Sequence, residues 1–408
     1  MSVVTGVVAA RGGLPVFLLL YGLLYASYGI EGPFLPALLA ERGLGPEAIG
    51  LLFAAGTGVR LVSGPLAAAV ADRSGNPRLV LAACMMAAAA ATAGYVLAGG
   101  FTALLLVGVV VSLALAPVNP MADALAMAAS LRPRAGFDYG LVRGAGSAAF
   151  VAAAALAGWL VAGLGNAAAV VAGVVLLAAA AAMVPLLPGS VPSKTEAAPR
   201  GSLAGARGLL RLPGFTRLLL LGGLVQGSHA VYGAFATIHW QQAGIAPGAI
   251  GLLWAVAVGS EIVVFALAGP WLLRVLGPAR LAALAAAAGV VRWAIMASTA
   301  ALPVQFLLQP LHGLTFAALH LASLRLLAGM VPPQLSATAF SLQATLGAGL
   351  ATALLTLLAG PLFAHAGGLA FWAMAALCAV AMPVALALQD EPRVEALPLP
   401  AMAPGMAE

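Results

Sequence analysis

Charged residues are scarce in this sequence. Asp, Glu, Lys and Arg make up only 7% of its 408 residues, whereas 63% are hydrophobic, and the mean hydropathy is +1.08. A soluble globular domain carries about 25% charged residues and about 45–50% apolar ones. The chain therefore has too few polar side chains to cover a surface that faces water, and we expect most of its surface to face lipid.

Cysteine is almost absent as well, and so are the short motifs of catalysis. Cys84 and Cys378 both fall in apolar stretches, which argues against a disulfide framework or a thiolate metal site. No nucleophile–base pair, metal-binding spacing or nucleotide-binding loop stands out, so we expect neither enzyme activity nor a cofactor. The first apolar run is too long for a cleavable signal peptide and lacks its cleavage site, so we expect it to stay as a span.

The sequence has long, continuous apolar runs instead. A membrane-spanning helix needs about 20 apolar residues, whereas the strands of a membrane barrel alternate polar and apolar residues. A helix also satisfies its own backbone groups in hydrocarbon. We therefore predict an all-α membrane protein with twelve transmembrane helices, at 14–38, 48–70, 78–98, 101–130, 138–163, 167–187, 216–240, 248–273, 279–299, 302–329, 336–364 and 368–388.

Most basic residues lie on one side of this predicted topology. Arg73 and Arg78 follow the second span, Arg132 and Arg134 follow the fourth, and several more lie in the segment 188–212. Cytoplasmic loops are enriched in Lys and Arg. We therefore expect both termini in the cytoplasm and the chain in a bacterial cytoplasmic (inner) membrane. The net charge of +6 is then explained by topology, not by nucleic-acid binding.

One long polar interruption divides the chain. The segment 188–212 is rich in Pro, Ser, Gly and basic residues, and the end of the chain is Pro-rich and acidic, a composition typical of disorder. The predicted organisation is an N-terminal six-helix bundle (1–187), a cytoplasmic linker loop (188–212), a C-terminal six-helix bundle (213–388) and a disordered cytoplasmic tail (389–408).

The two halves of the chain repeat one another. A shift of 201 residues lays "GLLYASYGIEGPF" at 22–34 over "GLVQGSHAVYGAF" at 223–235. The same shift lays "GPEAIGLLFAAGTGVRLVSGP" at 45–65 over "APGAIGLLWAVAVGSEIVVFA" at 246–266. Chance similarity among apolar residues would not keep one register across a turn. We infer an internal duplication that gives two bundles related by an axis along the membrane normal.

This parallel repeat resembles the architecture of the major facilitator superfamily, and one loop strengthens the resemblance. The string "GPLAAAVADRSGNPR" at 64–78 is similar to that superfamily's signature loop between the second and third spans. In the family this gating loop is thought to latch the two halves by ionic and helix-dipole contacts. The second half, "WLLRVLGPARL" at 271–281, has no Asp, so the latch is expected to be asymmetric. The matching residues are Gly64, Asp72, Arg73, Gly75 and Arg78.

Longer strings resemble a narrower group. They are similar to the 3-phenylpropionic acid transporter family, which lies near the nucleoside:proton symporters and the lactose permease type. This resemblance implies a monomeric secondary active transporter that takes up an aromatic carboxylate, or a related small organic molecule, with protons. A proton-coupled drug or metabolite exporter and a sugar or nucleoside symporter of the same fold stay open as alternatives. The strings are "PMADALA" (120–126), "FDYGLVRGAGSAAF" (137–150), "GSHAVYGAFATIHWQQAG" (227–244) and "GVVRWAIMASTAALP" (289–303).

Six charged residues fall inside the predicted spans. One charge at the bilayer centre costs about 2.5–3.5 kcal/mol on insertion scales, so six unpaired charges would cost on the order of 15–20 kcal/mol. We therefore expect them to pair or to face a cavity. The repeat aligns Arg60 with Glu261, so duplication followed by divergence has placed opposite charges at equivalent points. The six are Glu31, Arg60, Asp123, Arg143, Glu261 and Arg292.

Four further polar residues join them as candidates, because spans 1, 4, 7 and 10 line the central cavity in the facilitator architecture. They are His229, Tyr232, His312 and His320. The layout resembles the lactose permease type, in which acids on spans 4 and 8, arginines on spans 5 and 9 and a histidine on span 10 serve substrate and proton. That type has a second acid on span 10, which 302–330 lacks, so Glu261 or Glu31 would carry the proton.

Structural roles stay open for two of these residues. Arg60 could serve only to hold its helix against Glu31, and Asp123 could clamp Arg143 or Arg132 without touching substrate. No short spacing of the three histidines supports a metal site.

Overall fold

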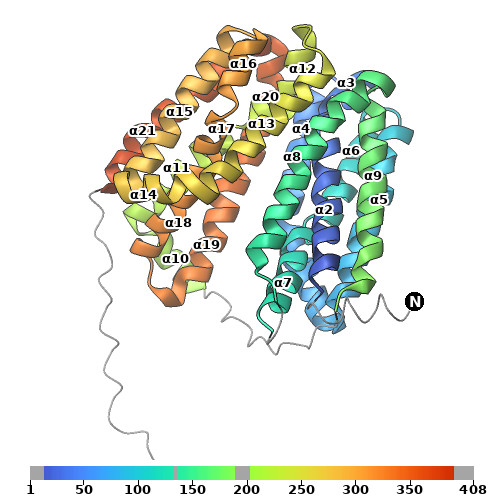
Figure 1. Cartoon of the computed structure of the whole chain (residues 1–408). Coiled ribbons are helices and arrows are strands. Elements are labelled where there is room, and N and C mark those ends of the chain that lie inside the picture. The colour runs from blue at the N-terminus through green and yellow to red at the C-terminus, as the bar shows by residue number, and fades with distance from the viewer. Residues whose placement is uncertain (1–12, 133–135, 189–202, 390–408) are drawn as a thin grey trace, which may run out of the picture.

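The computed structural model describes residues 13–132, 136–188 and 203–389, with the side chains of 64–74 and 203–204 left out of the description. Every element in these ranges is a helix (Figure 1). Several helices begin with proline in the first turn, where its missing N–H costs no hydrogen bond and its fixed φ suits the helix.

The first half contains six spans. Two of them are divided by a short break, between α2 and α3 and between α6 and α7. The helices are α2 (Leu14–Glu31), α3 (Leu35–Glu41), α4 (Pro46–Ser74), α5 (Pro77–Leu97), α6 (Phe101–Leu115), α7 (Val118–Ser130), α8 (Tyr139–Leu164) and α9 (Asn166–Met183), followed by the 3₁₀ turn η1 (Val184–Leu186).

The second half repeats this order with more interruptions. It opens with α10 (Leu203–Leu210), a short helix inside the segment that the sequence predicts to be a linker loop. Three π-helical segments interrupt its spans: η2 (Val264–Ala268), η3 (Leu314–Ala318) and η5 (Gln343–Leu350). The other elements are α11 (Pro213–Gly227), α12 (Ala230–Gln242), α13 (Pro247–Val263), α14 (Gly269–Leu276), α15 (Pro278–Ser298), α16 (Leu302–Leu308), α17 (Leu311–Gly313), α18 (Leu319–Met330), η4 (Pro333–Leu335), α19 (Ser336–Leu342), α20 (Ala351–Ala366), η6 (Gly367–Ala370), α21 (Phe371–Leu386) and η7 (Ala387–Gln389).

Within the described residues, ten helical runs are long and apolar enough to cross a membrane. The last run, Pro333–Gln389, turns back at Gly367, whose φ of 54° is a conformation that glycine adopts readily, and therefore holds two spans. Together with α4, the total is twelve. The predicted all-α membrane fold with two six-helix bundles is confirmed.

The duplication is visible in the helix boundaries. α4 begins at Pro46 and α13 begins at Pro247, a difference of 201 residues. α5 spans 77–97 and α15 spans 278–298, so both ends differ by the same 201 residues. The repeat therefore extends beyond the strings that show it in the sequence.

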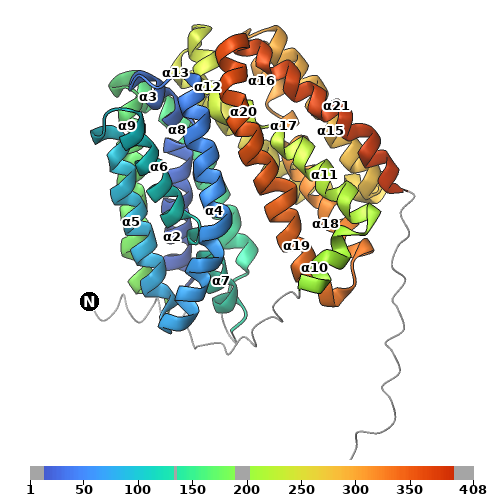
Figure 2. The ribbon, with the colours of Figure 1, turned by 180° about the vertical axis from the view of Figure 1, so that it is seen from behind.

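The two bundles touch at one end and diverge toward the other. They meet near α3, α12 and α16 and separate toward α7, α10 and α19 (Figures 1 and 2). We call the first end the closed end and the second the open end. One hydrophobic core joins residues of both halves, including Phe34 and Phe363, whereas the other two cores each belong to a single half.

The seam between the halves is built by two equivalent helix pairs, α8 with α13 and α4 with α20. Glycine lets the backbones meet in both pairs. A Cβ built on Gly50 would lie 2.9 Å from Cα of Gly360, and one built on Gly251 would lie 2.9 Å from the backbone N of Gly158. Gly50 and Gly251 are themselves 201 residues apart, so the seam follows the repeat.

Candidate functional site

A chain of hydrogen bonds links an acid, a histidine and an arginine in the second half. Nη1 of Arg292 lies 2.8 Å from Nδ1 of His312, and Nε2 of His312 lies 2.9 Å from Oε1 of Glu261. A guanidinium carries only donors, so Nδ1 must accept and the ring proton sits on Nε2. Neutral His312 therefore donates to Glu261. The arginine selects this tautomer and so points the N–H of the histidine at the acid.

Arg292 is held by aromatic and amide groups on every side. It is fully buried, its guanidinium carbon lies 4.4 Å from the ring centroids of both Tyr232 and Trp293, and Nη2 donates to Oε1 of Gln309 at 3.2 Å. The Tyr232 hydroxyl donates to the same oxygen at 2.9 Å. Both terminal nitrogens of Arg292 have partners, and only its buried Nε has none in the described residues, so we assign Arg292 mainly to organising the network.

His229 extends this network toward the core. Its Nδ1 donates to the carbonyl of Val225 at 3.1 Å, and its Nε2 lies 3.0 Å from Oγ1 of Thr315. Its ring meets that of His312 edge-on, with centroids 5.3 Å apart. His229, Tyr232, Glu261, Arg292 and His312 thus form one cluster, which we call the C-half polar network.

The first half holds a second cluster made of tyrosines, an acid and an arginine. Tyr21 donates to Oδ1 of Asp123 at 2.6 Å, and the guanidinium carbon of Arg143 lies 4.5 Å from the ring centroid of Tyr25. Nη1 of Arg143 is buried and has no hydrogen-bond partner in the described part of the chain. Arg143 lies on α8 and Glu261 lies on α13, and these two helices pack against each other across the seam, so the charge of Arg143 is near that of Glu261. The hydroxyl of Tyr139 also interacts with Asp123. We call Tyr21, Tyr25, Asp123, Tyr139 and Arg143 the N-half polar cluster.

Glu31 and Arg60 share a cavity of about 210 Å³ in the first half. Tyr28 and Tyr95 line it as well, and the two charges interact electrostatically. A small cavity that brings both charge signs together can hold an acid and a base without the full cost of burying each alone. The pair therefore fits either a local structural role or a second proton site.

A short relay of hydrogen bonds ties the halves together near the closed end. Nε1 of Trp254 donates to Oγ1 of Thr237 at 3.0 Å, and the Thr237 hydroxyl donates to the carbonyl of Pro33 at 2.5 Å. Thr237 lies in α12 and Pro33 follows α2, so the second bond crosses the seam. It holds α12 against the turn that follows α2.

Removing that bond should loosen the closed end. Thr237→Val keeps the side-chain shape and removes the hydroxyl, which donates across the seam and accepts from Trp254. The bond across the seam contributes about 0.5–1.5 kcal/mol net. We expect a shift of about twofold to tenfold toward the conformation open at that end. The measurement is the rate at which a cysteine placed at Leu35 reacts with an impermeant thiol reagent. An unchanged rate in Thr237→Val would show that the relay does not control opening.

Comparisons with known proteins match this architecture. A model of the MFS_1 like family matches residues 15–374. The chain belongs to the MFS_1 like family. Members of this major facilitator class are secondary transporters, so the predictions of a multi-pass membrane transporter and of no enzyme activity are confirmed.

Individual relatives of this MFS_1 like transporter cover most of its length. It is 34% identical over 368 residues to the "Probable 3-phenylpropionic acid transporter" of Escherichia coli (strain K12), covering 89% of this chain and 94% of that one. It is 28% identical to the maltose permease of Geobacillus stearothermophilus, covering 85% and 86%. A mutant form of the nucleoside transporter NupG superposes with a TM-score of 0.81 at 18% identity, over 91% of this chain and 98% of that one.

The structure sorts the ten predicted substrate and proton residues into groups. Five lie in the C-half polar network, two in the N-half polar cluster and two in the cavity of Glu31. His320 lies apart: it is exposed on α18 beside Phe265, with ring centroids 5.9 Å apart. Of the two histidines proposed for span 10, His312 therefore joins the acid. Asp123 accepts a hydrogen bond from Tyr21, so it is already part of the N-half polar cluster.

The gating loop is described only in part in this MFS_1 like transporter. The side chains of Gly64, Asp72 and Arg73 lie outside the described residues, so their latch stays a prediction. Gly75 ends α4 with a φ of 64°, and Nη1 of Arg78 donates to the carbonyl of Leu187 at 2.8 Å. Arg78 thereby holds the turn before α5 against the end of α9 and η1.

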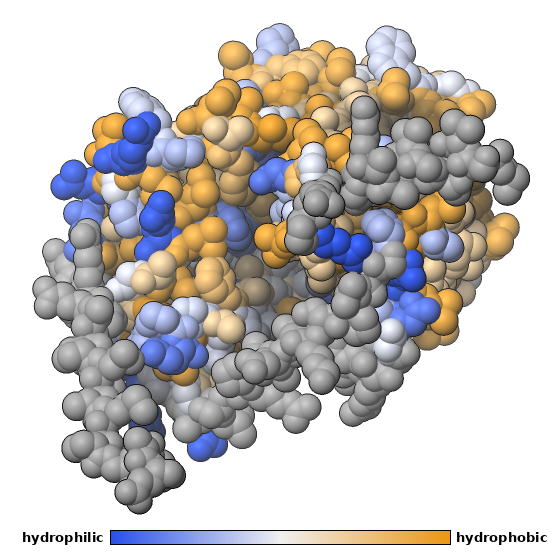
Figure 3. Space-filling model, turned by 60° about the horizontal axis from the view of Figure 1, so that its bottom comes forward, coloured by the Kyte–Doolittle hydropathy of each residue, from blue (hydrophilic) through white to orange (hydrophobic). Residues whose placement is uncertain are grey.

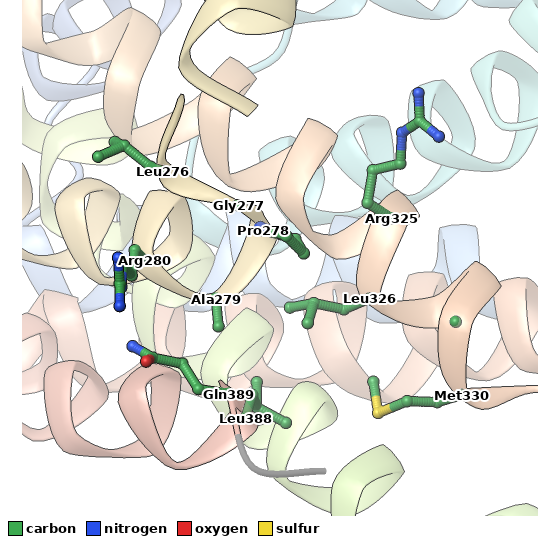
Figure 4. Close-up of a pocket in the computed structure, with 11 residues that line it drawn as sticks. Leu276, Gly277, Pro278, Ala279, Arg280, Arg325, Leu326, Met330, Leu388 and Gln389 are labelled. Atoms are coloured by element: carbon green, nitrogen blue, oxygen red, sulfur yellow. The ribbon is translucent and has the colours of Figure 1, made fainter. Parts of the chain in front are cut away.

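The equivalent turn of the second half borders a pocket of about 240 Å³. Arg280 and Arg325 line it, but their guanidinium groups point apart (Figure 4). Figure 3 shows the open end, with hydrophilic residues there and apolar residues along the flanks. This pocket shares no residue with either polar cluster, so we do not assign the substrate to it.

Sequence reasoning missed several uncharged members of the site. Gln309 joins Arg292 to Tyr232, and Gln305 accepts from Nε1 of Trp240 at 3.0 Å. A signal existed: Gln305, Gln309 and His312 are spaced four and three residues apart, which places them on one helix face. Amides repeated at helical spacing in an apolar span deserve the same scrutiny as charges.

Proposed function

We propose that the protein is a proton-coupled transporter that takes up an aromatic carboxylate across a bacterial cytoplasmic membrane. One observation carries this proposal: the Arg292–His312–Glu261 chain of hydrogen bonds ends on an acid of α13, and α13 packs across the seam against α8, the helix that carries Arg143. The acid therefore belongs to one half and its second cation to the other. Any motion of the halves changes that pairing.

The same arrangement links substrate to proton. A carboxylate bound to Arg143 would take over the cation that favours the charged form of Glu261, so Glu261 would accept a proton as substrate binds. Such linkage is reciprocal, because protonation of Glu261 must favour substrate binding to the same extent. Arg143 is the better anion ligand than Arg292, because a terminal nitrogen of Arg143 is buried without a partner in the described residues, whereas both terminal nitrogens of Arg292 are bonded and only its Nε is left without one.

Alternating access would come from rocking of the two bundles about the seam. We assign the termini and the open end to the cytoplasm, because the basic loops lie there, and this conformation would then face inward. The protein is proposed to act as a monomer, with the gradient of protons as its driving force.

A sugar or nucleoside symporter is the second candidate. Asp123 accepts from Tyr21, and Asn119 accepts from Tyr28 at 3.4 Å, so two oxygen acceptors line the first half as hydroxyl groups would require. The relatives named for maltose and nucleosides agree with this chemistry, each for its own protein. A proton-coupled exporter would predict the opposite direction of flux.

Uptake into proteoliposomes tests these alternatives together. The vesicles hold purified protein and an imposed pH gradient, acid outside, and receive labelled 3-phenylpropionate, uridine or maltose in parallel. We expect gradient-dependent accumulation of 3-phenylpropionate, abolished by a protonophore. Accumulation of uridine or maltose without accumulation of 3-phenylpropionate would support the second candidate. Proton-driven movement of 3-phenylpropionate in the direction opposite to the protons would support the exporter.

A further inference from the structure

The second half contains a cavity that the polar network does not fill. It measures about 450 Å³ and is lined by α11, η3, α18, α19, η5 and by Thr57 of α4. None of the residues that line it is charged. We call it the C-half chamber. Its lining includes Gln226, Phe316, His320, Phe340, Gln343 and Ala344.

The repeat relates this chamber to the N-half polar cluster. Subtracting 201 takes Gln226 to Tyr25 and Ala344 to Arg143. The first half therefore has an aromatic ring and a cation where the second half has the amide of Gln226 and the methyl group of Ala344 beside an open space. The reverse holds for the other pair of sites, because subtracting 201 from Glu261 gives Arg60, which lines the open cavity of the first half. Each half is filled where the other is hollow.

The walls of the chamber are locally irregular. Phe316 lies in η3, and Gln343, Ala344 and other lining residues lie in η5. The three π-helical segments all belong to the second half, and the described helices of the first half contain none. π segments are rare and occur frequently at functional sites. The π segments and the chamber therefore occur in the same half of the chain, and η3 and η5 supply part of the chamber wall.

The chamber adjoins the groups proposed to handle charge. Phe316 stacks on His312, with ring centroids 5.7 Å apart and 22° between the planes. His312 in turn bonds to Glu261, on which Arg143 acts across the seam. Thr57 closes the chamber from the first half, so both features lie along the same seam. A molecule with an anionic end and an apolar end could contact both.

We propose that the C-half chamber receives the uncharged aromatic ring of the substrate and sets its specificity, while the carboxylate lies toward Arg143. This rests on the proposed function. A buried apolar cavity of about 150 Å³ holds benzene, so 450 Å³ accommodates a ring with a short side chain. The lining contains no Arg or Lys to pair with a carboxylate, whereas Arg143 has an unpartnered nitrogen, so the bound acid is expected to turn its ring toward the chamber and its carboxylate toward Arg143.

Filling the chamber tests this assignment. Ala344→Phe would place a phenyl group inside it, and Ala348→Phe would do so from the next turn. The dissociation constants of purified protein for 3-phenylpropionate and for propionate are measured, since the two acids differ only in the ring. Burying a phenyl side chain favours binding about tenfold to a hundredfold. We expect the wild type to show such a preference and Ala344→Phe to reduce it about tenfold.

The matched control is Leu346→Phe, which adds a ring on the same helix at an exposed position outside the chamber. It should keep the wild-type preference. Thermal unfolding shows whether each variant is folded. If Ala344→Phe does not fold, the binding preference of Ala348→Phe tests the assignment in its place. Wild type that binds both acids equally, or filled variants that keep the full preference, overturn the chamber assignment alone. Wild type that binds neither acid overturns the proposed function.

Discussion

Glu261→Gln should abolish accumulation of substrate driven by a pH gradient while leaving exchange of substrate across the membrane measurable. With one proton per substrate, a gradient of one pH unit supports an accumulation of up to about tenfold, because each pH unit is about 1.36 kcal/mol. Without a proton carrier the ratio should fall to about one. The measurement compares gradient-driven uptake with exchange of labelled for unlabelled substrate in the same proteoliposomes.

The geometry makes this substitution a selective one. The amide oxygen of a glutamine at 261 can still accept the hydrogen bond from Nε2 of His312, which now spans 2.9 Å to the acid. The fold of the network is therefore preserved and only the titration is lost. Removal of a buried partner outright would instead leave His312 unsatisfied.

Two further substitutions serve as a control and a comparison for Glu261→Gln. Glu47→Gln makes the same chemical change at an exposed position in the first turn of α4 and should keep full accumulation. Glu31→Gln examines the other acid that could carry the proton. Full accumulation by Glu261→Gln, with loss in Glu31→Gln, would move the coupling role to the cavity of the first half.

Arg143→Gln should weaken binding of carboxylate substrates about tenfold to a hundredfold. Hydrogen bonds to charged groups contribute about 1.5–3 kcal/mol, and the buried Nη1 of Arg143 has no protein partner in the described residues that would compete for the anion. The primary amide of the same acid carries no charge and should bind Arg143→Gln and wild type alike. The measurement is the dissociation constant for each compound.

Arg143→Lys and Arg280→Gln complete this test. Lysine keeps the charge but not the planar stacking on Tyr25, so we expect partial recovery of carboxylate binding. Arg280 is exposed at the open end and its loss should change nothing. Equal affinity of Arg143→Gln and wild type for the carboxylate would remove Arg143 from the site and point to Arg60 instead.

Much of the fold could be predicted because lipid leaves few alternatives. Continuous apolar runs must become helices, and the register of 201 residues between "GLLYASYGIEGPF" and "GLVQGSHAVYGAF" already implied paired bundles. The breaks within spans were not predicted. The π-helical segments, in particular, have no counterpart in composition, and two of them, η3 and η5, line the C-half chamber.

The candidate site was predictable only where charge marked it. The cost of burying Glu261 and Arg292 demanded partners, and the structure supplies His312 and Gln309. Charge could not distinguish His312 from His320, because the choice depends on which helix face turns toward α13. Charge also could not reveal the C-half chamber, because a cavity depends on how the helices pack and not on which residues the sequence contains.

The glycine pairs of the seam carry a consequence for how the protein responds to its surroundings. Where Gly50 meets Gly360 and Gly158 meets Gly251, main chain rests on main chain and no interlocking side chains need to disengage. The energy barrier to rotation of one bundle against the other at these points should therefore be low. The balance between the two orientations should then follow the lateral pressure of the bilayer, so that thickness and headgroup size of the lipid tune turnover.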